Sequence, residues 1–280
     1  MEMNISFATI RPFIEKLLKE DGLEQNFNYL HNLPNKKVKL LLKFKSDALL
    51  SGFAFFNSVF KYFDESIDLD FLLEYEGKKI KEGEQVEISL PFSVALSGER
   101  LALNLLQHAS AISTFTNKFT SLCPDVAILD TRKTTPGLRT LEKYAVIKGG
   151  GYNHRFDQSD IWMIKDNHKV FFGGLTKAYH FFKDQKSFYK PIVAEIHNLS
   201  ELEEAKKCGI KHLMLDNFSP EDIKKAIELK KEGMTYEVSG GIKLENCQSY
   251  LIEGVDALSI GCLTQNPPNI DISLKVQSLL

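Results

Sequence analysis

The stretch PIVAEIHNLSELEEAKKCGIKHLMLDN, residues 191–217, decides the fold. Short apolar runs stand at its two ends, at 191–194 and 213–215, and the segment 202–208 between them has helical spacing of its apolar residues. Parallel strands need a crossover of about a dozen or more residues between them, usually a helix. Apolar runs without alternation are typical of strands that are buried on both faces. The stretch therefore predicts a parallel sheet that is covered by helices.

The same pattern continues in both directions along the chain. Six apolar runs are expected to be strands, at 126–129, 161–164, 191–194, 213–215, 236–238 and 257–260. Helices are expected between them, at 141–147, 202–208, 220–231 and 244–253. A complete eight-unit barrel needs roughly 200 to 250 residues, and the segment that follows Pro124 is shorter than that. We therefore predict an incomplete parallel α/β barrel of about six strands.

The N-terminal part of the chain mixes the two kinds of element. Helices are expected at 10–19 and 53–63, and strands at 38–44, 69–75 and 86–90. This mixture predicts an α/β sandwich. A long helix is expected at 98–122, because apolar residues recur there at steps of three and four until Pro124 ends the pattern. We predict an α/β protein with a sandwich domain at 1–108 and a barrel domain at 109–280.

Composition excludes several classes of protein. The 280 residues carry a formal net charge of −2, so no basic surface for nucleic acid is expected. Apolar runs stay well short of the roughly 18 residues of a membrane-spanning helix. The start MEMNISFATIRPF lacks the pattern of a secretory signal, and the four cysteines form no CxxC pair that would indicate structural zinc. We expect a cytoplasmic protein with neither a nucleic-acid nor a membrane partner.

Polar residues and glycines follow each of the six predicted strands. In chain order they are Asp130 to Lys133, Lys165 to His168, Glu195 and His197, Asp216 and Asn217, Ser239 to Gly241, and Gly261. The C-terminal ends of parallel barrel strands form one rim, which is where enzymes of this architecture carry out chemistry. We therefore expect these residues to converge on a single site.

The residue types on this rim indicate an anionic substrate. Its cations are Arg132, Lys133, Arg155 and Lys165. Arginine binds carboxylates and phosphates through paired hydrogen bonds, and glycine-rich strand ends expose backbone N–H groups to a phosphate. The carboxylates of Glu195 and Asp216 beside phosphates indicate a hydrated Mg²⁺ ion. Taken singly, a Ser-Gly-Gly turn or an Asp-Asn pair is more often structural, but their placement on one rim favours a ligand site.

The same residues lie in motifs that resemble the quinolinate phosphoribosyltransferase family. The motifs are GERLALNLLQH (98–108), LDTRKTTPGLRTLEKYAVIKGGGYNHR (129–155), MIKDNH (163–168), LMLDN (213–217), EVSGGI (237–242) and GVDALSIGCLT (254–264). The resemblance implies transfer of 5-phosphoribosyl from 5-phosphoribosyl-1-pyrophosphate to quinolinate, with decarboxylation. The products would be nicotinate mononucleotide, pyrophosphate and CO₂, in NAD biosynthesis, with Mg²⁺ as cofactor.

The resemblance also implies roles for individual residues. The quinolinate carboxylates would be held by Arg100, Arg132, His154, Arg155 and Lys165. Lys133 would contact the phosphoribosyl donor, and Glu195 and Asp216 would bind the ribose hydroxyls and the metal. The 5-phosphate would lie against Ser239, Gly240, Gly241 and Gly261. A homodimer, or a higher oligomer built from it, would share its active sites, with Arg100 completing the pocket of the neighbouring subunit.

Three other interpretations remain open from the sequence. A molybdenum-uptake-associated relative shares part of the TRKT motif, but KDNH and the ending SIGCLT argue against it. A lyase that forms a Schiff base needs a lysine in apolar surroundings, whereas Lys133 and Lys165 are flanked by Arg132 and Asp166. A sensor of a phosphate ligand, without catalysis, has no use for Glu195 and Asp216, because carboxylates repel anions.

Overall fold

The computed structural model describes residues 6–26 and 31–280, which form two compact units. The barrel unit comprises Lys118–Thr135 and Gly151–Asn266. The sandwich unit comprises the described residues of Met1–Asn117 together with Pro136–Gly150 and Pro267–Leu280. The predicted domain boundary after residue 108 lies within the long helix α4, Phe92–Leu122, and stays a prediction. Among the described residues, none of the helices has both the length and the apolar character needed to cross a bilayer.

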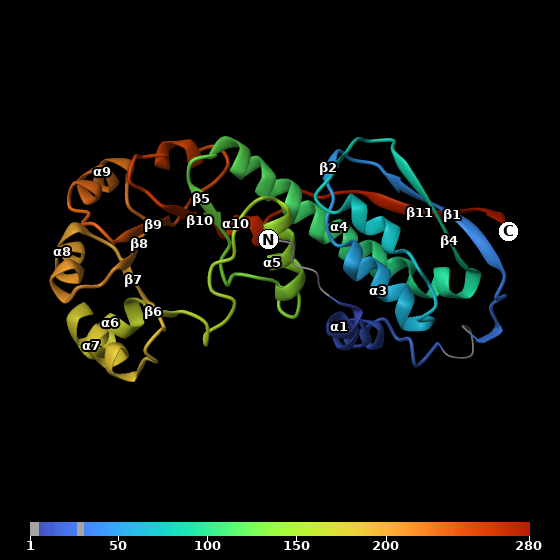
Figure 1. Cartoon of the computed structure of the whole chain (residues 1–280), viewed down its shortest axis with the longest axis horizontal. Coiled ribbons are helices and arrows are strands. Elements are labelled where there is room, and N and C mark those ends of the chain that lie inside the picture. The colour runs from blue at the N-terminus through green and yellow to red at the C-terminus, as the bar shows by residue number, and fades with distance from the viewer. Residues whose placement is uncertain (1–5, 27–30) are drawn as a thin grey trace. The chain divides into compact units, whose positions relative to one another are not determined.

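A parallel sheet with the strand order β5-β10-β9-β8-β7-β6 forms the centre of the barrel unit. Its strands are β5 Ala127–Leu129, β6 Trp162–Ile164, β7 Ile192–Ile196, β8 His212–Asp216, β9 Thr235–Ser239 and β10 Ala257–Ser259. Figure 1 shows α6 Asp166–Phe172, α7 Leu175–Gln185, α8 Leu199–Cys208 and α9 Pro220–Glu228 along the outer side of the strands. The sheet ends at β5 and at β6, so the barrel is open. The predicted incomplete parallel barrel is therefore confirmed.

Burial explains why the strand sequences are almost continuously apolar. Helices cover the outer face of β7 and β8, and the inner face contributes to a core within the barrel. Met163, Val193 and Met214 form a buried cluster, against which Ile161 packs. Because both faces of these strands are buried, period-two alternation is lost and only short apolar runs remain in the sequence.

The sandwich unit contains an antiparallel sheet with the order β11-β1-β4. Its strands are β1 Lys37–Phe44, β4 Gln85–Pro91 and β11 Ile272–Leu279, and a smaller sheet pairs β2 Ala48–Leu49 with β3 Lys79–Ile80. The helices of the unit are α1 Phe7–Glu20, α3 Phe53–Phe63, α5 Arg139–Lys148 and most of α4. Figure 1 shows α3 and α4 on one side of the three-stranded sheet. This mixture of helices and an antiparallel sheet confirms the predicted α/β sandwich.

Two predicted elements are wrong. Residues 69–75, predicted as a strand, form the 3₁₀ helix η1 Asp70–Tyr75, and the Asp68 carboxylate just before it accepts from the Asp70 N–H at 2.9 Å. Residues 244–253, predicted as a helix, contain only the short 3₁₀ helix η2 Cys247–Tyr250. There the Asn246 amide donates to the Gly241 carbonyl and accepts from the Lys243 N–H, which favours a turn over a regular helix.

Candidate active site

Two adjoining cavities lie at the C-terminal ends of the barrel strands. Their volumes are 470 and 450 Å³, which suits a small-molecule ligand. Four residues line both cavities: Arg132, Arg155, Met163 and Lys165. The first cavity is also lined by Thr131, Lys133, His154, Glu195, Met214, Asp216, Ser239 and Ser259. The second is also lined by Gln158, Trp162, Asn167, His168 and Phe182.

Two guanidinium groups meet where the cavities join. Burial lowers the pKa of Arg155, and the positive charge of Arg132 lowers it further, whereas Glu195 and Asp160 raise it. The Nη1 atom of Arg155 donates to the Ile161 carbonyl at 3.1 Å. The Nε atom of Arg132 is buried and has no hydrogen-bond partner among the described residues. The two positive charges and the buried Nε donor of Arg132 both favour binding of an anionic ligand at the junction of the cavities.

Lys165 connects the cationic side of the site to the acidic side. It follows β6 directly, and its Nζ lies 2.6 Å from Oε2 of Glu195 at the end of β7. Its backbone N–H donates to Nδ1 of His168 at 2.9 Å. Burial lowers the pKa of His168, and the charges of Lys165 and Arg155 lower it further, which favours the neutral ring that this acceptor role requires. The KDNH motif therefore fixes the start of α6, from which Lys165 reaches the cavities.

Two carboxylates form the acidic side. Glu195 and Asp216 end the neighbouring parallel strands β7 and β8, and both line the first cavity. Burial raises the pKa of Asp216, and the Glu195 carboxylate raises it further, while His197 and Lys165 lower it. Two carboxylates that repel each other on a cavity wall suit a hard divalent cation, which takes oxygen ligands. Ligand atoms of Asp166, Glu195 and His197 also lie within 4.8 Å of one another.

The turn after β9 requires glycine for steric reasons, and the turn after β10 packs closely against Lys133. Gly240 has φ +98° and Gly241 has φ +63°, and a Cβ on Gly240 would lie 2.8 Å from the backbone nitrogen of Asn217. A Cβ on Gly261 would lie 3.3 Å from Cδ of Lys133. The hydroxyl of Thr264 donates to the Lys133 carbonyl at 2.7 Å, which ties the loop after β5 to the turn after β10. Lys133 and the glycine turns are thus brought to the same side of the rim.

His154, which is predicted to bind a quinolinate carboxylate, already has a partner at each ring nitrogen. Its Nδ1 accepts from the Arg155 N–H at 2.7 Å, and its Nε2 lies 3.2 Å from Oε2 of Glu237. The carboxylate of Asp130, which is fully buried, accepts from the backbone N–H of His154 at 2.9 Å. His154 lines the first cavity, but both ring nitrogens are engaged. It can bind a substrate carboxylate only by giving up one of these partners.

The structure brings together most of the residues predicted for the site. Eight of them line the first cavity: Arg132, Lys133, His154, Arg155, Lys165, Glu195, Asp216 and Ser239. Gly240, Gly241 and Gly261 lie in the adjoining turns. Arg100 is exposed on α4 in the sandwich unit. The sequence placed Thr131, Asn167 and His168 on the rim without giving them a role. It did not indicate the other lining residues, which are Gln158, Trp162, Met163, Phe182, Met214 and Ser259.

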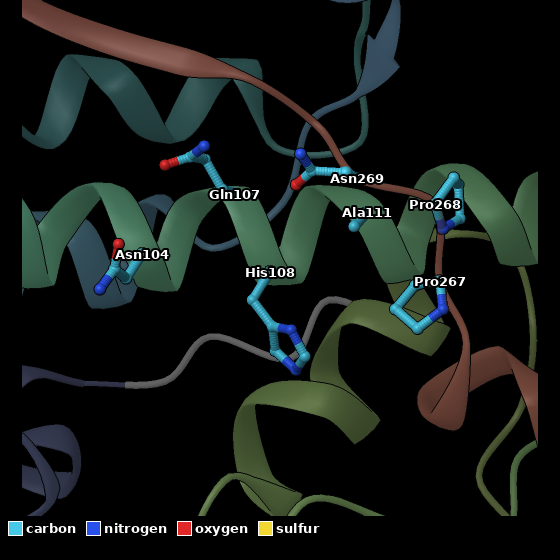
Figure 2. A pocket seen from close by; sticks show the side chains of 7 residues that line it. All are labelled: Asn104, Gln107, His108, Ala111, Pro267, Pro268 and Asn269. Carbon is cyan, nitrogen blue, oxygen red and sulfur yellow. The ribbon is translucent and has the colours of Figure 1, made fainter.

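A third hollow, of 320 Å³, lies within the sandwich unit. Figure 2 shows its lining: Asn104, Gln107, His108 and Ala111 on α4, facing Pro267, Pro268 and Asn269. Nε2 of His108 lies 2.9 Å from the buried Glu142 carboxylate. No lysine or arginine is among the lining residues of this hollow, so its chemistry does not match a ligand with several negative charges. The rim cavities are the better candidate for the active site.

Comparison with known proteins agrees with the geometry of the rim. The sequence profile for the C-terminal domain of quinolinate phosphoribosyl transferase matches residues 109–275, and the profile for its N-terminal domain matches residues 24–110. The chain belongs to the quinolinate phosphoribosyl transferase family. Its membership confirms the family that the sequence motifs predict and makes the chain a phosphoribosyltransferase.

Relatives in the quinolinate phosphoribosyl transferase family cover nearly the whole chain. The probable nicotinate-nucleotide pyrophosphorylase [carboxylating] of Bacillus subtilis is 38% identical over 83% of this chain and 81% of its own length. The human nicotinate-nucleotide pyrophosphorylase [carboxylating] is 31% identical over 96% of this chain and 92% of its own. The crystal structure of NadC from Streptococcus pyogenes superposes with a TM-score of 0.89 at 33% identity, covering 100% of both chains. These matches favour the predicted family over the three alternatives.

Proposed function

We propose that this chain transfers a 5-phosphoribosyl group from 5-phosphoribosyl-1-pyrophosphate to quinolinate, with decarboxylation to nicotinate mononucleotide. The observation that carries the proposal is the joined pair of cavities, cationic at the junction and acidic on one wall. Quinolinate is a dianion with adjacent carboxylates, and the donor carries a phosphate and a diphosphate. Cations and carboxylates on one rim suit two such substrates side by side. The names of the relatives support the same reaction.

Quinolinate binds, in this proposal, on the cationic side. Arg132 and Arg155 have their guanidinium groups near each other, and Lys165 lines both cavities beside them. Each substrate carboxylate would relieve the repulsion between the guanidinium groups and satisfy the unused Nε donor of Arg132. Trp162 and Phe182, with ring centroids 5.7 Å apart, supply an apolar wall for an aromatic ring.

The donor binds, in this proposal, on the acidic side, between the carboxylates and the glycine turns. The 5-phosphate lies against backbone N–H groups of Ser239, Gly240, Gly241 and Gly261. Lys133, which packs against the Gly261 turn, contacts the diphosphate. Glu195 and Asp216 face the ribose hydroxyls and would hold Mg²⁺. Bound there, Mg²⁺ would neutralise charge on the leaving diphosphate.

The reaction needs positioning and charge complementarity rather than a side-chain nucleophile. The bond from the anomeric carbon to the diphosphate oxygen breaks, and positive charge develops on the ribose. The carboxylates of Glu195 and Asp216 stabilise that charge while the quinolinate nitrogen forms the new bond to the anomeric carbon. The pyridinium nitrogen then accepts electron density as the adjacent carboxylate leaves as CO₂, and the ring carbon takes a proton. Holding both substrates in register is the main contribution of the protein.

We further propose a homodimer with shared sites in a reducing cytoplasm. Arg100 is exposed on α4 of the sandwich unit, where it is available to a second copy of the chain. All four cysteines are free thiols, which agrees with a reducing compartment. The dimer proposal is tested by mixing inactive variants, as argued in the Discussion.

A strong preference for quinolinate over nicotinate is expected. Nicotinate lacks one of the two carboxylates, so one charge-assisted pair is lost at a site that the bound substrate desolvates, which costs roughly 2 to 5 kcal/mol. Steady-state assays with each acid at a saturating donor concentration measure the ratio of the two kcat/KM values. A preference of about 30-fold or more is expected from that energy. Comparable turnover of nicotinate would show that the cationic side does not bind two carboxylates.

A further inference from the structure

A histidine lies among three carboxylates behind the acidic side of the rim. Nε2 of His197 lies 2.7 Å from Oδ1 of Asp166 and 3.7 Å from Oε1 of Glu195. Its other ring nitrogen, Nδ1, lies 3.7 Å from Oδ2 of Asp216. Glu195 and Asp216 line the first cavity, whereas His197 is not among the lining residues. The imidazole therefore touches the donor-side carboxylates from outside the space that the substrates would occupy.

The backbone around His197 is fixed by a buried lysine. The N–H of His197 donates to Oε2 of Glu201 at 2.9 Å, and Lys169 holds both oxygens of that carboxylate, at 3.1 and 2.9 Å. Lys169 is only 8% exposed, and its Nζ also donates to the Glu195 carbonyl at 3.2 Å. The segment after β7 is thereby tied to α6, which begins at Asp166. The backbone at His197 is therefore held in place by hydrogen bonds, and its ring lies beside the carboxylates.

The imidazole also contributes to the electrostatics of the two carboxylates. Glu195 raises the pKa of Asp216, next to the larger effect of burial, and His197 and Lys165 oppose that effect. Lys165 also lines both cavities, where quinolinate competes for it as a partner. His197 lies behind the wall and has no such competing partner in the proposed complex.

We propose that His197 is a positioning residue for the donor half of the site. Its ring nitrogens face Glu195 and Asp216 at 3.7 Å each and would keep these carboxylates in the arrangement that binds the ribose and its Mg²⁺, while the 2.7 Å contact with Asp166 anchors the ring. The inference rests on the proposed function, because it assigns the donor to the side of these two carboxylates. It predicts that loss of the imidazole weakens donor binding and leaves quinolinate binding intact.

Two variants separate the donor groups of the ring from its volume. His197→Phe keeps a planar ring of similar size but has no N–H, whereas His197→Gln keeps two N–H donors on a flexible chain. His180→Gln, at an exposed position on α7 of the same unit, is the matched control. Calorimetric titration of each folded protein with 5-phosphoribosyl-1-pyrophosphate plus Mg²⁺, without quinolinate, measures donor affinity directly. Titration with quinolinate alone measures the other half of the site.

His197→Phe is expected to raise the donor Kd at least tenfold and to change the quinolinate Kd by less than twofold. His197→Gln is expected to recover most of the donor affinity, and His180→Gln to match the wild type. Steady-state assays should show the same split, with a raised KM for the donor and an unchanged KM for quinolinate. A donor Kd within twofold of wild type in His197→Phe, or equal weakening of both substrates, would overturn the inference. A wild-type protein that does not bind the donor would overturn the proposed function as well.

Discussion

Lys165→Ala is expected to reduce kcat/KM by about 30-fold to about 5,000-fold, because truncating one partner of a charge pair that the bound substrates desolvate costs roughly 2 to 5 kcal/mol. The ammonium group lies 2.6 Å from Glu195; the Lys165 side chain is 45% exposed in the free protein and that of Glu195 is 12% exposed. The variant removes a cation from both cavities and leaves that carboxylate without its nearest positive charge. Substrate binding and the alignment of the two substrates are both expected to suffer.

Two further variants show whether the loss of activity comes from the missing charge at residue 165. Lys165→Arg keeps the charge but replaces a compact ammonium with a planar fork, so it is expected to restore only part of the activity. Lys177→Ala, at an exposed position on α7, is expected to behave as the wild type. Thermal unfolding of all three proteins checks that the fold is kept. Wild-type kinetics in a folded Lys165→Ala protein would remove Lys165 from the site.

Mixing Arg100→Ala with Lys165→Ala is expected to restore activity that neither variant shows alone. If Arg100 completes the pocket of the neighbouring subunit, a mixed dimer contains one site with both defects and one site with neither. Random exchange at equal amounts makes half of the dimers mixed, so about a quarter of the wild-type activity is expected, as the closed symmetry of a dimer requires. Co-refolding the two proteins and assaying the mixture measures this recovery.

The control for this experiment is each variant refolded alone, with subunit exchange followed by a mass tag on one of them. Recovery after confirmed exchange would place Arg100 and Lys165 of different subunits in one site. A mixture that stays as inactive as its components would show that Arg100 acts within its own chain or has no part in the site. A solvated surface arginine would matter little, because exposed ion pairs contribute under about 1 kcal/mol.

The parallel sheet could be predicted from the sequence because its strands are buried on both faces. Each strand leaves a short apolar run such as 213–215, and a polar residue such as Asp216 marks its C-terminal end. The strand β11 was not predicted, since its partner β1 is more than two hundred residues away and its own burial is confined to its first residues. The segment 69–75 was predicted wrongly, because five of its seven residues are apolar and their spacing satisfies both the strand period and the helix period.

The candidate site could be predicted where a residue follows a strand, and not where it lies inside one. Lys165, Glu195 and Asp216 are visible in the sequence as charged residues after apolar runs. Met163 and Met214 line the first cavity from within strands, where no alternation distinguishes the inward face from the outward one. The role inferred for His197 depends on distances to Asp166 and Asp216, which approach it only through the packing of three separate βα units.

The reaction itself gives the most direct test of the account. The purified protein is incubated with quinolinate labelled in the 2-carboxylate, 5-phosphoribosyl-1-pyrophosphate and Mg²⁺, and all products are quantified. Nicotinate mononucleotide, pyrophosphate and labelled CO₂ are expected in equal amounts, with no product when quinolinate, the donor or the enzyme is left out. Pyrophosphate or labelled CO₂ released without nicotinate mononucleotide, or no turnover of a folded protein, would contradict the account.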